Sequence, residues 1–120
     1  MCIRDRDTGP ELITGSTRLK AGTATKMILN MISTTTMVKL GKVYGNLMVD
    51  LMAVNDKLVD RATRIISQLA AVDTSTAKKA LIESNMSVKT AVVMLCRSVD
   101  RDSAIKMIED NNGMLRKIIS

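Results

Sequence analysis

The chain has 120 residues, 46% of them hydrophobic and 25% charged, which is the balance of a folded domain rather than of a disordered segment. It holds ten Met, one Tyr and neither Phe nor Trp, so any core must be aliphatic and thioether. Because it has no histidine, the sequence excludes a Ser-His-Asp triad and the usual zinc sites.

The net charge of +6 raises the question of a nucleic-acid partner. The cations are scattered and often followed by acids, and Tyr44 is alone where single-strand binders use several stacking aromatics. We therefore expect no nucleic acid. Between Arg18 and Lys42, five cations occur without an acid, which suits an anionic ligand such as a phosphate, although a solvated helix face explains such a run more often.

The cysteines and the apolar runs indicate the cellular setting. Cys2 and Cys96 form no CxxC motif, and the apolar helical pattern around Cys96 predicts a buried, reduced thiol. Nothing resembles a signal peptide, and the apolar runs are too short to span a bilayer. These features predict a cytoplasmic protein with no membrane partner.

The N-terminal third is expected to contain a leader and one helix. Residues 1–8 are predicted to be unstructured, and the first six look foreign to the rest. From Thr17 a helical pattern begins, with Ser16 or Thr17 as its cap and Gly41 as its end. One face of this helix is apolar; it consists of Ala24, Met27, Ile28, Met31, Ile32, Thr35 and Val38.

The remainder is expected to be mainly α-helical, without strand alternation. Residues 42–54 contain a Gly-Asn turn signal and are predicted to be extended or irregular. Asn55 is expected to cap a second helix, and three short helices follow at 75–85, 88–97 and 101–111, with a last turn at 114–119. Their predicted caps are Ser75, Ser87 and Asp100. Such helices predict a small bundle.

The stretch "TGST" before the first helix is the best candidate for a ligand site. Its glycine allows a close backbone approach, and the following helix N-terminus favours anions, with Arg18 and Lys20 adding full charges. Glu11, in the preceding loop, could also reach a ligand. The alternative is that Ser16 and Thr17 only cap a helix while the two cations face water.

Lys57 is the second candidate. It lies in the first turn of the predicted second helix, where a cation opposes the helix dipole. A bound anion would explain this position, but a salt bridge with Asp56 or Asp60 is the commoner reason. Asp50 looks partly buried and is expected to bind backbone N–H groups or a cation. Neither Glu11 nor Asp50 forms a convincing catalytic pair.

The segment "GPELITGSTRLKAGTATK", residues 9–26, closely resembles the signature of the N-acetylmuramic acid 6-phosphate etherases, a group that includes the glucokinase regulatory protein. "GKVYGNLMVDL" and "NDKLVDRATRII" resemble the continuation of the same proteins. The resemblance implies a sugar-isomerase-type (SIS) α/β domain followed by a small helical tail, in a cytoplasmic bacterial homodimer. It also implies metal-free cleavage of a D-lactyl ether by two glutamates, with no cofactor.

This chain departs from the family in length. In the family, the sheet and both catalytic glutamates precede the signature, so the resemblance implies a C-terminal fragment that has no catalytic residue of its own. Residues 1–8 would be a non-native leader, residues 9–54 the end of the SIS domain, and residues 55–120 the helical region with a three-helix, UBA-like bundle. The resemblance assigns sugar-phosphate contact to Lys57. It leaves open whether Glu11, Ser16, Thr17, Arg18 and Lys20 line the site or only hold the helix. A non-catalytic regulator of the same group remains the alternative function, and a free-standing helical interaction module is the third hypothesis.

Overall fold

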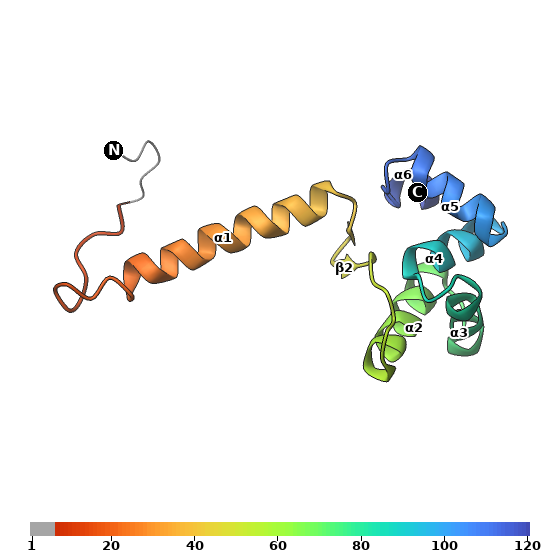
Figure 1. Cartoon of the computed structure of the whole chain (residues 1–120), viewed down its shortest axis with the longest axis horizontal. Coiled ribbons are helices and arrows are strands. Elements are labelled where there is room, and N and C mark those ends of the chain that lie inside the picture. The colour runs from red at the N-terminus through yellow and green to blue at the C-terminus, as the bar shows by residue number, and fades with distance from the viewer. Residues whose placement is uncertain (1–6) are drawn as a thin grey trace. The chain divides into compact units, whose positions relative to one another are not determined.

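The structure is a computed structural model that describes residues 7–120. Most of the predicted leader, residues 1–6, lies outside the described residues. The chain divides into two compact units, one ending at Thr36 and the other spanning Met37–Ser120. The described residues are mainly helical, as predicted, with six helices and two short strands (Figure 1). None of the described helices is both long and apolar enough to cross a membrane.

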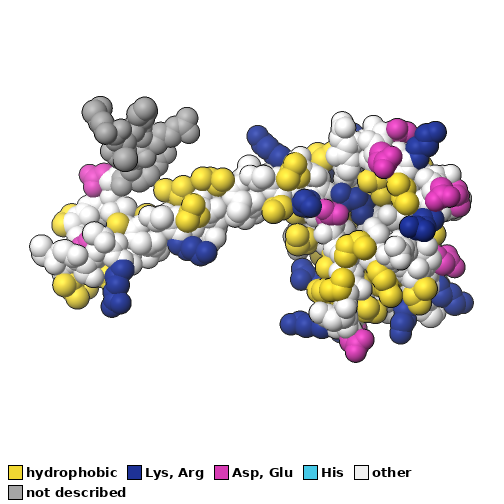
Figure 2. Space-filling view, viewed as in Figure 1, with side chains coloured by type: hydrophobic (Ala, Val, Ile, Leu, Met, Phe, Trp, Pro, Cys, Tyr) yellow, Lys and Arg dark blue, Asp and Glu magenta, His cyan; other side chains and the backbone are white. Residues whose placement is uncertain are grey.

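Helix α1 (Lys20–Lys39) contains no buried residue. Its apolar face is at the surface, as Figure 2 shows: Met27, Met31 and Ile32 are 55%, 61% and 59% exposed. The helix begins at Lys20, so the predicted start at Thr17 was wrong by three residues. Its predicted end is confirmed, because Gly41 takes φ +73° and Lys42 N–H donates to the Met37 carbonyl at 3.1 Å.

A short hairpin follows the first helix. Strands β1 (Val43–Tyr44) and β2 (Leu47–Met48) pair antiparallel, with Val43 opposite Met48. Gly45 occupies the turn at φ +59°, in agreement with the Gly-Asn turn signal. The extended character of this segment was predicted, but the strand pair was not. Strands of two residues are too short to display an alternating pattern.

Five helices make up the rest of the second unit: α2 (Asp56–Ala70), α3 (Thr74–Glu83), α4 (Val88–Arg97), α5 (Arg101–Asp110) and α6 (Arg116–Ile119). Asn55 and Ser87 cap α2 and α4 as expected, since their side chains accept the N–H groups of Leu58 and Thr90. The predicted cap Ser75 was wrong. Asp73 caps α3, and Ser75 lies inside the helix.

Helix α4 is the centre of the core. It contacts α2, α3, α5 and α6, and its first six residues are all buried. The buried hydrophobic residues of the described chain all belong to the second unit: Val49, Ala53, Ala62, Ile65, Ile66, Ala77, Ala80, Leu81, Val88, Ala91, Val92, Val93, Ala104, Leu115 and Ile118. Cys96 is free and exposed, so the predicted buried thiol was wrong. It lies in the last turn of α4, beyond the buried residues.

Candidate functional site

The loop before α1 is organised by Glu11. Its carboxylate accepts the Lys20 N–H at 2.9 Å and the Ala21 N–H at 3.0 Å. These are amides of the first helical turn, which have no partner within the helix. The N–H groups of Ala21 and Lys20, and then the Lys20 charge, hold the pKa of Glu11 below its ordinary value. Glu11 therefore supplies the cap that the sequence assigned to Ser16 or Thr17.

This arrangement changes what the helix end can do for a ligand. A helix N-terminus attracts an anion because it offers unpaired N–H groups, and here a carboxylate of the same chain already takes two of them. A phosphate would have to displace Glu11 or bind beside it. What remains beside it is a polar rim: Thr17, Arg18 and Lys20 are exposed and Ser16 is half-buried.

Two glycines in this loop have left-handed backbone conformations. Gly9 and Gly15 have φ values of +70° and +85°, and no atom lies within 4 Å of the Cβ position of either. The Ser16 N–H closes a turn onto the Ile13 carbonyl at 3.0 Å. The left-handed backbone at Gly15 thus turns the chain directly before Ser16, Thr17 and Arg18, which was not predicted from the sequence.

Lys57 is exposed in the first turn of α2, on the second unit. It lines a hollow whose wall is formed by Asn55, Lys57, Leu58, Asp60, Arg61 and Arg64. The expected alternative was an ion pair with Asp56 or Asp60. Within residues 7–120, Lys57 forms no such pair, and Asp60 instead binds Arg64 at 2.8 Å, one turn further along. A local salt bridge therefore does not account for the position of this lysine.

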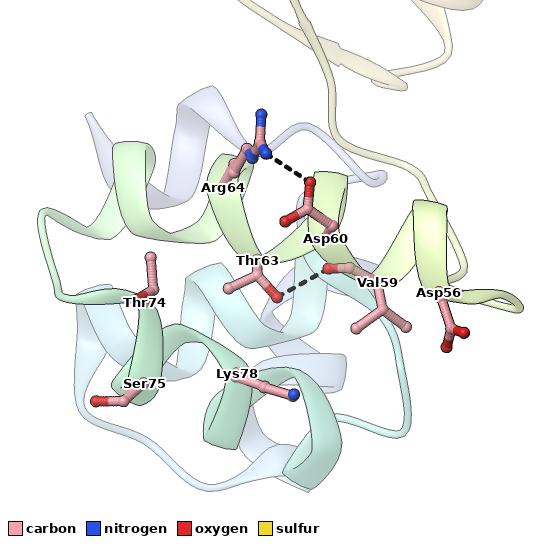
Figure 3. A pocket seen from close by; sticks show the side chains of 8 residues that line it. All are labelled: Asp56, Val59, Asp60, Thr63, Arg64, Thr74, Ser75 and Lys78. Carbon is pink, nitrogen blue, oxygen red and sulfur yellow. Dashed lines mark hydrogen bonds and ion pairs between the residues drawn. The ribbon is translucent and has the colours of Figure 1, made fainter.

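A second hollow lies between α2 and α3 (Figure 3) and contains none of the predicted site residues. Three of its polar side chains have partners nearby. Asp60 pairs with Arg64, and the Thr63 hydroxyl donates to the Val59 carbonyl at 2.8 Å. Asp56 and Lys78 line the same hollow, and neither forms an ion pair within residues 7–120. Across the described residues, no group of three acidic or cysteine side chains is arranged to hold a metal ion.

The structure brings several of the predicted residues together within the first unit. Glu11 and Lys20 meet through the backbone at the start of α1, with Ser16, Thr17 and Arg18 in the intervening loop. Lys57 belongs to the other unit. Asp50 was expected to bind a cation or backbone N–H groups, and it pairs with Lys42 at 2.6 Å; it is exposed rather than partly buried.

Sequence reasoning missed Lys89. This lysine is only 8% exposed, and its ammonium group donates to the carbonyls of Gly41 and Gly113 at 2.9 and 2.7 Å. The partners are 48 and 24 residues away in the chain. No local pattern could have pointed to them, because neighbouring residues give no indication of contacts at such separations.

Comparison with known proteins gives two findings. Residues 45–91 match the family described as the C-terminal lid domain of glucokinase regulatory protein. The chain is also 56% identical over 113 residues to N-acetylmuramic acid 6-phosphate etherase of Oceanobacillus iheyensis, covering 94% of this chain and 38% of the relative. The etherases of Mycolicibacterium smegmatis and Mycoplasma mycoides are 54% and 52% identical over 112 residues. The chain spans less than two-fifths of the length of these relatives.

Proposed function

We propose that this chain is the C-terminal part of an N-acetylmuramic acid 6-phosphate etherase. The chain belongs to that family, and it spans 38% of the length of one relative. The enzyme cleaves the D-lactyl ether of N-acetylmuramic acid 6-phosphate and releases N-acetylglucosamine 6-phosphate and D-lactate. This reaction recycles cell-wall sugar. The observation that carries the proposal is the 56% identity over 94% of the chain.

In the proposed reaction, one glutamate removes the proton at C2 of the sugar and a second protonates the departing ether oxygen. Water then adds to the unsaturated sugar. Both glutamates belong to the part of the family that precedes the signature, so none of residues 7–120 is proposed as catalytic. We propose on this ground that the 120-residue chain alone releases no D-lactate.

This chain would contribute to substrate binding. Lys57 is proposed to contact the sugar phosphate, because it is an exposed cation that no local ion pair occupies. In this proposal Glu11 acts by holding the first turn of α1, which sets the position of Ser16, Thr17, Arg18 and Lys20 beside the sugar phosphate. A lysine suits this task as a compact cation that pairs with phosphate oxygens.

The finer architecture is part of the same proposal. Residues 9–54 would complete a SIS-type domain, and residues 55–120 would form the helical region, with α3 to α5 as a UBA-like bundle. The long enzyme would be a cytoplasmic homodimer. The apolar, uncovered face of α1 supports this division, because a helix that completes a larger α/β domain has such a face to bury.

A second candidate function is a regulator that binds the sugar phosphate without chemistry. The match of residues 45–91 to the lid domain of glucokinase regulatory protein favours it. The two functions differ in one measurable product, because only the enzyme converts the bound sugar phosphate to D-lactate.

The decisive experiment joins residues 7–120 to the part of the Oceanobacillus iheyensis etherase that this chain does not match. We expect this chimera to release D-lactate from N-acetylmuramic acid 6-phosphate and the 120-residue chain to release none. A folded chimera that binds N-acetylglucosamine 6-phosphate but releases no D-lactate would favour the regulator. Lactate release by the 120-residue chain alone would contradict the proposal that both catalytic glutamates lie outside it.

Lys57→Ala tests the binding role in the same chimera. Because a hydrogen bond to a charged group contributes about 1.5–3 kcal/mol, KM should rise by about 10- to 100-fold while kcat changes little. The matched control is Lys79→Ala, which removes an exposed lysine of α3 that lies outside the hollow lined by Lys57. Equal effects of the two substitutions on KM would mean that Lys57 makes no specific contact with the sugar phosphate.

A further inference from the structure

Lys89 is the one charged side chain that is buried in the described part of the chain. It lies in the first turn of α4, and its ammonium group reaches two carbonyls from distant segments, those of Gly41 and Gly113. Gly41 follows the end of α1, and Gly113 follows the end of α5. A single side chain therefore joins three segments of the second unit.

The burial of this cation has a cost that the two carbonyls offset. Burial lowers the pKa of Lys89, and the charge of Asp50 opposes this effect. No carboxylate of the described residues lies within ion-pair distance of Lys89. Asp50 forms its ion pair with Lys42 instead. The carbonyls of Gly41 and Gly113 are thus the groups that replace the water the ammonium has lost.

The two glycine turns are themselves in close contact. Gly41 and Gly113 have φ values of +73° and +74°, and a Cβ atom at residue 41 would lie 2.6 Å from the Gly113 carbonyl oxygen. Only glycine fits at residue 41 without a shift of the backbone. The turn after α1 and the turn after α5 are therefore packed against one another, with the Lys89 ammonium between their carbonyls.

We infer that Lys89 is a positioning residue that clamps the turn after α1 and the turn after α5 onto α4. Within the second unit, the clamp ties the start of the hairpin to α4 and to the turn after α5. Helix α2, which contains Lys57 in its first turn, packs on α4. The clamp's role in placing Lys57 therefore acts through α4 and rests on the proposed function. The existence of the clamp does not.

The clamp is tested by Lys89→Met in the full chain, which keeps the length of the side chain and removes its donors. Lys79→Met is the matched control, because Lys79 is an exposed lysine of α3. Amide hydrogen exchange should rise about tenfold or more at Lys42, Val49 and Gly113, while amides in the middle of α2 and α3 keep their rates. The control variant should exchange like the wild type.

Two results would overturn the clamp. One is an unchanged exchange rate at Lys42, Val49 and Gly113, and the other is an equal rise at every protected amide, which would mean a general loss of stability. If Lys89→Met does not fold, the wild-type chain decides. We expect scalar couplings across the hydrogen bonds from Lys89 Nζ to the carbonyl carbons of Gly41 and Gly113. A folded wild type without either coupling would refute the clamp.

The positioning role has its own readout in the active chimera. Lys89→Met should raise KM in the direction of Lys57→Ala with a smaller change in kcat, and Lys79→Met should alter neither constant. Local opening at Lys42 and Gly113 with an unchanged KM would remove the positioning role and leave only an architectural tie. A chimera without any lactate release would contradict the proposed function and leave the exchange result intact.

Discussion

Helices α1 and α4 show how differently two regions of this chain use apolar residues. Helix α1 has 20 residues and buries none, whereas α4 has 10 residues and buries the first six. Both contain apolar residues at helical spacing. The difference lies in their surroundings, because α4 is enclosed by four other helices, while the face of α1 that contains Met27 and Met31 is exposed.

This contrast teaches that an apolar pattern specifies a face but not the surface that covers it. The threonine-rich part of α1 is a poor helix former. The hydroxyls of Thr25 and Thr36 donate hydrogen bonds to backbone carbonyls one turn earlier in the helix. Helices of this kind depend on packing for their stability. In the second unit that packing comes from within the chain. For α1, the described residues supply almost none.

The sharpest test of the contrast compares one substitution in each region. Leu81→Ala removes a fully buried side chain of α3 and should lower the free energy of unfolding by about 2–5 kcal/mol. Met31→Ala, on the exposed face of α1, should change it by no more than about 0.5 kcal/mol. Urea unfolding followed by circular dichroism measures both. A comparable loss for Met31→Ala would mean that the α1 face is covered in solution.

A smaller effect is expected from the cap of α3. Hydrogen bonds from the hydroxyls of Ser75 and Thr76 lower the pKa of Asp73 to about 2 from an ordinary 3.8. A depressed carboxyl pKa contributes stability that is present above pH 3.8 and is lost as the pH falls toward about 2. The urea midpoint of the wild type should fall through this window.

Asp73→Asn is the control for the α3 cap, because it retains a capping oxygen and removes the titrating group. The difference in urea midpoint between wild type and Asp73→Asn should shrink as the pH falls through the window. A difference that stays constant from neutral to acid pH would show that the Asp73 carboxylate is not the source.

The smallest effect is expected at Glu11. Glu11→Gln weakens the acceptor for the Lys20 and Ala21 N–H groups, so the first turn of α1 should lose helicity. Cα chemical shifts at Lys20–Thr23 measure this loss, and shifts in α2 to α5 should stay fixed. Because the pKa of Glu11 is lowered, the wild type should keep this turn down to below pH 4.5 and lose it with further acid. A wild type that frays at neutral pH would contradict the cap.

The sequence predicted the contacts between residues close together in the chain and missed those between residues far apart. The caps Asn55 and Ser87 lie within three residues of the amides that they bind, and the predicted helices at 88–97 and 101–111 match α4 and α5 to within a residue. The start of α1 was missed because its cap, Glu11, lies nine residues before the first amide that it accepts. A short-range rule favoured the nearer hydroxyls of Ser16 and Thr17.

The candidate site shows the same dependence. The polar residues of the loop before α1 could be named in advance, because a glycine and hydroxyls directly before a helix are a local pattern. The use of Glu11 against the helix end could not, nor could the burial of Lys89 between two glycine carbonyls. Both depend on which segments the fold brings together. The burial of Cys96 was predicted wrongly because helical period does not show where along a helix the packing stops.

The exposed methionines on α1 have a chemical consequence. The thioether of methionine oxidises to a sulfoxide when an oxidant can reach it, and that change converts an apolar side chain into a polar one. Met27 and Met31 of α1 and Met52 of the second unit are more than half exposed, whereas Met94 and Met107 are only partly accessible. Mild peroxide treatment followed by peptide mass spectrometry should therefore oxidise Met27, Met31 and Met52 before Met94 and Met107. If Met27 and Met31 were protected from oxidation in a longer protein, this would show that another surface buries this face of α1.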